Sequence, residues 1–102
     1  MREVLILITT ETNQKIAKKI AKNIIVSNLA ACVSIKNIYS VYKWEDNIEE
    51  TKEFEITIKT KPEFKDDLID FLQQMTSYDV PQILYKKFHS ESKYHDWLTK
   101  TI

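Results

Sequence analysis

Cys32 is the only cysteine in this chain of 102 residues, and its thiol has the clearest potential for chemistry. A thiolate is a soft ligand that suits Cu(I), and copper stands at the top of the affinity order for divalent first-row metals. Cys32 also follows two alanines at the expected start of a strand, where a lone cysteine is often a small buried hydrophobe. Both interpretations stay open, because one thiolate needs further ligands to hold a metal.

The two histidines, His89 and His95, are the other candidate soft ligands. They lie six residues apart, across an expected loop between a strand and a helix, which is no recognised ligand spacing. Surface histidines are therefore favoured. They become ligands only if assembly brings them to Cys32 of a neighbouring chain.

Five acidic residues lie close together near the middle of the chain: Glu45, Asp46, Glu49, Glu50 and Glu53. Alternation along a strand puts Glu49 and Glu53 on one face and Glu50 on the other, so no single cage for a hard cation is evident. We expect a solvated edge, or one that forms salt bridges between subunits. The lysines between residues 15 and 22 are natural partners.

Tyr39, Tyr42 and Trp44 form an aromatic group just before this acidic run. Such residues are enriched in the centres of protein interfaces, so we interpret them first as interface anchors. The alternative is that they line a cleft for a small molecule between subunits.

The composition argues against several other functions. The absence of glycine excludes a P-loop and a dinucleotide fingerprint, and no recognised catalytic arrangement appears, so we expect no enzyme. The net charge of zero predicts no strong attraction to nucleic acid. The apolar run at residues 4–8 is too short to span a membrane. A lone cysteine suits a reducing compartment, so we expect the cytoplasm.

The hydrophobic patterning predicts one domain over residues 1–102. A strand at 3–9 is apolar on both faces, and Thr10 or Thr12 is expected to cap the helix that follows. Residues 31–60 read as a long hairpin joined at residues 45–47, with a bulge near 36–38 or an outer half that is buried on both sides. A second helix begins at Pro62, a strand covers 82–88, and a last helix starts at Ser92.

This order, β-α-β-β-α-β plus a helix, predicts an α+β fold of the ferredoxin-like type, with both main helices on one face of an antiparallel sheet. The first strand is nevertheless apolar on both faces, so one apolar face of the sheet would stay exposed. Self-association, with sheets facing inward and hairpin arms pairing with neighbours, resolves this conflict.

Four runs of residues then point to a known family. L-A-A-C-V-S-I at residues 29–35 and Y-K-W-E-D-N-I-E-E at 42–50 resemble L-A-A-C-V-N-I and Y-W-W-E-G-K-I-E-E of the CutA divalent-cation tolerance proteins. I-K-T at 58–60 and Y-D-V-P-Q at 78–82 match I-K-T and Y-E-V-P-E. The resemblance implies a non-enzymatic homotrimer with an architecture similar to the PII signalling proteins. It also implies tolerance to divalent metal ions, copper above all.

The resemblance also implies where a site would lie. Family members usually carry His-Pro before the tyrosine of the last motif, and that histidine is a proposed copper ligand; Thr76 and Ser77 stand there in this chain. Cys32 is then the one remaining candidate for a metal ligand. The cleft between subunits would be formed by Tyr39, Tyr42, Trp44, Glu45, Tyr78, Asp79 and Pro81. Two alternatives stay open: a PII-like sensor or scaffold that binds a small molecule or partner in this cleft without metal, and a structural trimer without a ligand.

Overall fold

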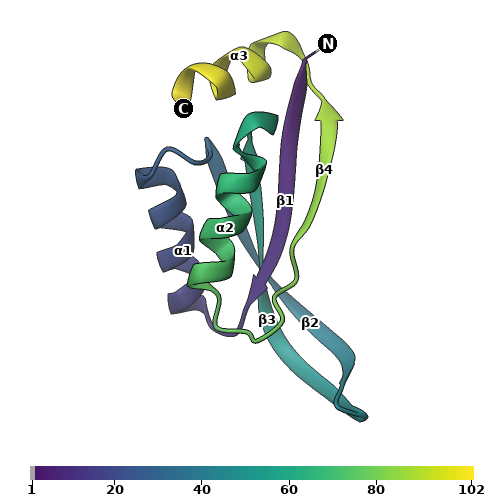
Figure 1. The fold of residues 1–102 in the computed structure, drawn as a ribbon. Helices are drawn as coiled ribbons and strands as arrows, with labels where there is room; N and C mark the ends of the chain where they lie inside the picture. The colour runs from purple at the N-terminus through teal and green to yellow at the C-terminus, as the bar shows by residue number, and fades with distance from the viewer. Residues whose placement is uncertain (1) are drawn as a thin grey trace.

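The computed structural model describes residues 2–102, which form one four-stranded sheet with helices beside it (Figure 1). The elements follow in the order β1 (Glu3–Glu11), α1 (Gln14–Val26), β2 (Cys32–Trp44), β3 (Asn47–Thr60), a 3-10 turn (Pro62–Phe64), α2 (Lys65–Met75), β4 (Leu84–His89) and α3 (Ser92–Thr101). The strand order is β2-β3-β1-β4, and every neighbouring pair is antiparallel. The predicted α+β order of elements is therefore confirmed.

The core lies between one face of the sheet and helices α1 and α2. Alternate residues of β1 and β3 point toward the helices, and α1 and α2 each bury one stripe, as helical and strand periodicity require. The fully buried members include Leu5, Leu7, Ile20, Ile24, Ile56, Ile58, Leu68 and Leu72. This packing fixes the sheet on which the candidate site is built.

The opposite face of the sheet is apolar along β1, as the sequence predicts, and along part of β4. Ile6 and Ile8 of β1 are only half-buried there. The register pairs Ile8 with Leu84 and Val4 with Phe88, and Leu84 and Phe88 remain exposed. A single chain therefore leaves apolar surface on this face, which we call the open face.

The cap of helix α1 differs from the prediction. β1 continues to Glu11, so Thr10 belongs to the strand, and Asn13 is the N-cap residue instead. Its side-chain oxygen accepts a hydrogen bond of 2.9 Å from the backbone N–H of Ile16. At the other end Asn28 adopts a positive φ of 58°, which closes the helix without a glycine.

The β2–β3 hairpin is regular along its whole length. Its register runs without interruption from the Cys32–Lys59 pair to the Trp44–Asn47 pair, so the bulge predicted near residues 36–38 is absent. Glu45 and Asp46 alone form the turn, with φ of 50° and 66°, and Asn47 already pairs within β3. Positive φ at both central residues is the geometry of a type I′ hairpin turn, which matches the twist of the strands.

The outer half of the hairpin projects beyond the rest of the molecule (Figure 1). β1 pairs with β3 only as far as the Glu11–Phe54 pair, so residues 47–53 of β3 lack a β1 neighbour. At about 3.4 Å per residue this overhang is roughly 24 Å long. In one chain the outer half is exposed on both sides rather than buried on both.

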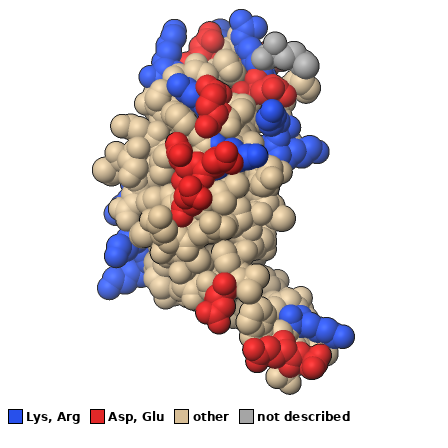
Figure 2. Space-filling model, in the orientation of Figure 1, with Lys and Arg blue, Asp and Glu red and all other residues tan. Residues whose placement is uncertain are grey.

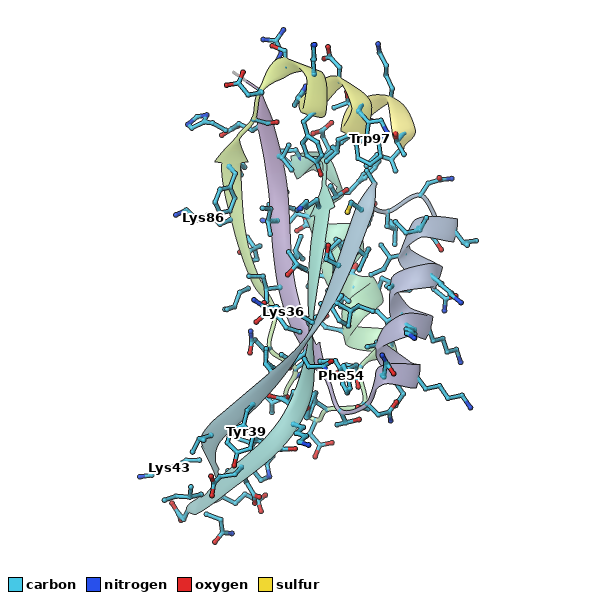
Figure 3. The ribbon with its side chains drawn as sticks, turned by 180° about the vertical axis from the view of Figure 1, so that it is seen from behind. Lys36, Tyr39, Lys43, Phe54, Lys86 and Trp97 are labelled. Atoms are coloured by element: carbon cyan, nitrogen blue, oxygen red, sulfur yellow. The ribbon has the colours of Figure 1, made fainter. Side chains whose placement is uncertain are left out.

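The last strand and helix are also shifted from the prediction. β4 begins at Leu84 rather than at residue 82, because the chain before it bends at residues 77–81 to contact β1 and β3. α3 lies at the end of the sheet opposite the hairpin tip, and Trp97 lies on it (Figures 1 and 3). Leu98 anchors α3 by complete burial.

Candidate functional site

A groove of about 690 Å³ opens where the hairpin leaves the sheet. One wall is the outer half of β2 and β3, and the other is the segment of residues 77–82 between α2 and β4. The side chains that give it chemical character are Tyr42, Trp44, Glu49, Glu53, Tyr78 and Asp79. The groove thus combines aromatic rings with carboxylates from segments far apart in sequence.

The two walls are joined by a hydrogen bond from the hydroxyl of Tyr78 to Oε2 of Glu53. Glu53 is only 8% exposed, although its neighbours on β3 toward the hairpin tip are largely exposed. Burial, followed by the hydrogen bond to Glu53, raises the pKa of Tyr78 above its usual value. The tyrosine therefore stays a neutral donor to the carboxylate.

A second buried carboxylate fixes the same segment to β1. Glu11 is 1% exposed and accepts a hydrogen bond of 3.1 Å from the backbone N–H of Ser77. The Ser77 hydroxyl lies within hydrogen-bonding distance of the other Glu11 oxygen, which also accepts from the backbone N–H of Thr12 at 3.3 Å. Because buried polar groups need partners, these contacts determine where Tyr78 enters the groove.

The structure brings together four of the residues that were expected at a cleft: Tyr42, Trp44, Tyr78 and Asp79. Tyr39 points to the other face of the hairpin, where its hydroxyl donates to Glu50 at 2.8 Å. That hydrogen bond raises the pKa of Tyr39. Figure 3 shows Tyr39 and Lys43 on the projecting part of the hairpin.

Glu45 and Pro81 lie near the groove in sequence but not on its walls. Glu45 occupies the turn at the hairpin tip. Pro81 is half-buried beside the wall residues Val80 and Gln82. Neither residue contributes a wall of the groove in one chain.

Cys32 lies far from this groove. It begins β2, is half-buried, and pairs with Lys59, whereas Ser77 contacts the Glu11–Phe54 end of the sheet. Five residues along a strand separate the two positions by about 17 Å. Thr76, at the position of the family's histidine, is thus at the other end of the sheet from Cys32.

Tyr94 of α3 lies near Cys32. Burial, and then the electrostatic interaction with Cys32, raises the pKa of Tyr94 on α3. His89 is exposed at the end of β4, and Nδ1 of His95 lies 3.8 Å from the carboxylate of Asp96. Within residues 2–102 no three histidine, cysteine, aspartate or glutamate side chains gather closely enough to hold a metal ion.

The acidic residues of the hairpin divide into two groups. Figure 2 shows acidic and basic side chains together on the hairpin tip, as a solvated edge predicts. Glu49 and Glu50 are exposed on opposite faces, as expected. The solvated edge does not include Glu53, because that residue is buried beneath Tyr78.

Sequence reasoning missed the pairs that build the groove, Glu53 with Tyr78 and Glu11 with Ser77. Their members are 25 and 66 residues apart, so no local spacing could indicate them. Nothing in the sequence indicated directly that Glu11 is buried, because a charged side chain at the end of an apolar strand is ordinarily expected to turn to solvent.

The fold and groove define a class of protein: a ferredoxin-like sheet with a hairpin that projects past it and shares a groove with the segment before the last strand. Within this class the chain belongs to the CutA family. The family described as CutA1 divalent ion tolerance protein matches residues 4–101.

Related sequences agree with this assignment. The Divalent-cation tolerance protein CutA of Archaeoglobus fulgidus is 36% identical over 87 residues, which cover 84% of this chain and 85% of that protein. Human Protein CutA is 38% identical over 71% of this chain, and Arabidopsis thaliana Protein CutA, chloroplastic, is 33% identical over 92%. The chain spans only 41% and 53% of the lengths of these two relatives.

Solved structures give the same result. CutA from Synechococcus elongatus PCC7942 superposes with a TM-score of 0.94 at 32% identity, covering 99% of this chain and 91% of that chain. The periplasmic divalent cation tolerance protein CutA from Archaeoglobus fulgidus gives 0.92 at 31% identity, covering 96% and 97%. Among residues 2–102 no helix is long and apolar enough to cross a membrane.

Proposed function

We propose that this chain is a non-enzymatic divalent-cation tolerance protein that works as a homotrimer in the cytoplasm and handles copper. The observation that carries this proposal is the family match over residues 4–101. The lone cysteine supports a reducing compartment, while the names of relatives include chloroplastic and periplasmic proteins.

Two features of the chain support assembly. The projecting hairpin leaves Tyr39 62% exposed and Ile48 70% exposed, and the open face leaves Leu84 56% exposed. Exposed apolar surface of this kind is typical of an interaction site. A trimer in which each arm lies on a neighbouring subunit covers both surfaces at once.

The residues of one chain do not fit a copper ion. Cys32 offers one thiolate, and Thr76 cannot replace an imidazole about 17 Å away along the sheet. Copper handling by Cys32 therefore requires ligands from a neighbouring subunit.

A copper titration of the assembled protein tests this role. Cu(I) is titrated in competition with a chromophoric chelator into wild type, Cys32→Ala and Ser34→Ala. Ser34 is the matched control, because it lies two residues along β2 on the same face. We expect Cys32→Ala alone to lose affinity, and equal binding by all three proteins would remove Cys32 from the site.

The groove supports a second candidate function, a PII-like sensor or scaffold that binds a small molecule without metal. The favouring observations are the groove of about 690 Å³ and Thr76 at the position of the missing histidine. A thermal-shift screen with and without chelator separates the two functions. A metal-free ligand raises the melting temperature equally in both conditions, whereas a metal-dependent one loses its effect with chelator.

A further inference from the structure

Helix α1 carries a row of positive charges on its exposed side, which we call the lysine stripe. Its 13 residues contain no acidic residue. The stripe consists of four exposed lysines spaced i, i+3, i+4 and i+7, which places them on one face of the helix: Lys15, Lys18, Lys19 and Lys22. Within residues 2–102 none of these lysines lies within salt-bridge distance of a carboxylate.

The stability of α1 does not explain the lysine stripe. Like charges three or four residues apart on a helix repel each other. The first turn of α1 contains Lys15 and no acidic residue, although the helix dipole favours negative charge at this end. Both effects disfavour the lysines, so their benefit lies outside the helix itself.

The neighbouring helix of the same layer carries a matching row of negative charges, which we call the acidic stripe. It begins in the 3-10 turn, continues along α2, and repeats the spacing of i, i+3, i+4 and i+7 in four exposed residues: Glu63, Asp66, Asp67 and Asp70. Among residues 2–102 only Asp66 of this stripe has a salt-bridge partner, Lys65 at 3.8 Å. At about 1.5 Å per residue, each stripe is roughly 10 Å long.

The two stripes lie at opposite ends of the helix layer. α1 and α2 run in opposite directions, and each stripe lies toward the N-terminal end of its helix (Figure 1). Figure 2 accordingly shows acidic side chains over α2 in the upper part of this face and basic side chains at its lower left edge, beside α1. The stripes therefore do not pair with each other within one chain.

A helix layer with this pattern is complementary to itself. In a two-fold contact the same surface is used by both copies, so that every pairing occurs twice. Turning a second copy end over end places its acidic stripe opposite the lysine stripe of the first copy, and its lysine stripe opposite the acidic stripe. Four charges of each sign, with the same spacing, then face each other in both halves of the contact.

We propose that the helix layers of two copies of this chain dock on each other, lysine stripe against acidic stripe. The layer is free for this contact in the proposed trimer, because the sheets face inward there. The contact therefore joins one trimer to another, and it depends neither on metal nor on the groove. Exposed salt bridges are individually weak and are screened by salt, so we expect the association at low ionic strength and well above micromolar protein concentration.

Sedimentation velocity of the full chain at low and at high salt, in the presence of EDTA, tests the proposal with three variants. The base-reversed variant carries Lys18→Glu with Lys22→Glu. The acid-reversed variant carries Asp67→Lys with Asp70→Lys. The charge-swapped variant carries all four substitutions, so the sign of each stripe is exchanged while the complementarity is kept.

We expect the wild type to form species heavier than its high-salt mass when the salt is lowered. The base-reversed and the acid-reversed variants should lose these species. The charge-swapped variant should regain them, and so should an equal mixture of the base-reversed and acid-reversed proteins. The matched control, Lys93→Glu with Lys100→Glu, makes the same change in net charge as the base-reversed variant, but on exposed residues of α3, and should behave as wild type.

The absence of heavier species of wild type at low salt would overturn the proposal. Their loss in the α3 control would do the same, as would a failure of both the charge-swapped variant and the mixture to regain them. A lower high-salt mass of the base-reversed variant would also contradict it, because the lysine stripe would then belong to contacts within the trimer, such as those with the acidic hairpin tip. The high-salt mass of wild type reports on the trimer separately, so a failure of the trimer and a failure of this contact are distinguishable.

Discussion

Trp44 lies on the projecting arm that we place on a neighbouring subunit, so Trp44→Ala should weaken trimerisation. The side chain is 41% exposed in one chain. A tryptophan offers up to about 250 Å² for burial, so roughly 100 Å² remains for the partner to cover. At about 25 cal/mol per Å² this is roughly 2.5 kcal/mol, or about a 60-fold change in association constant for each contact.

Sedimentation velocity over a dilution series measures this effect, with Cys32→Ala as the comparison. Cys32 is half-buried at the far end of β2 and offers a much smaller side chain to a partner. We expect Trp44→Ala to dissociate at much higher concentration than wild type and Cys32→Ala to behave nearly as wild type. Equal effects, or a larger effect of Cys32→Ala, would refute the placement of the interface.

Three further predictions concern single contacts. Replacing the turn residues together, Glu45→Asn with Asp46→Gly, should raise the free energy of unfolding by about 1 kcal/mol in urea denaturation, because both occupy positive φ; a decrease would argue against the type I′ turn. Ser77→Ala should lower that free energy by about 1–3 kcal/mol, since buried Glu11 loses a donor; an unchanged midpoint would show that the contact contributes nothing. The pKa of Tyr78 is raised on folding, so its protonated hydroxyl stabilises the folded state below about pH 10, the usual pKa of tyrosine. This contribution is lost as the pH rises toward the higher pKa that Tyr78 has in the folded protein. Denaturation across alkaline pH should therefore show a shallower loss for Tyr78→Phe than for wild type, and identical slopes would contradict the prediction.

The elements of the fold could be predicted because their signals are local. The continuous apolar run of β1 indicated a strand with two apolar faces, and both faces are indeed apolar. The alternation of apolar and polar residues along β3 puts Ile56 and Ile58 on one face, and both are buried in the core. Element boundaries were less certain: Thr10 and Thr12 looked like caps, but β1 extends past Thr10, and Asn13 caps the helix.

The groove could be predicted only in part, because it depends on contacts between distant segments. The aromatic residues of the hairpin and the motif around Tyr78 were expected to border a cleft, and one groove contains both. The buried carboxylate of Glu53 could not be foreseen, since alternation on a strand gives a face but not what covers it. Tyr78, 25 residues away, covers Glu53.

The outer half of the hairpin shows the limit of reasoning from one chain. Its apolar residues occupy both faces, which suggested a bulge, but the register is regular and the residues are exposed. When both faces of a strand carry apolar residues, both faces usually pack against other elements. We propose that neighbouring subunits cover both faces.

The most direct test of this account is the mass of the wild-type protein at micromolar concentration, measured by light scattering coupled to size exclusion. We expect a single species with three times the chain mass of 12.1 kDa. A species of 12.1 kDa would contradict it, because the hairpin arm and the open face would then have no subunit to cover them.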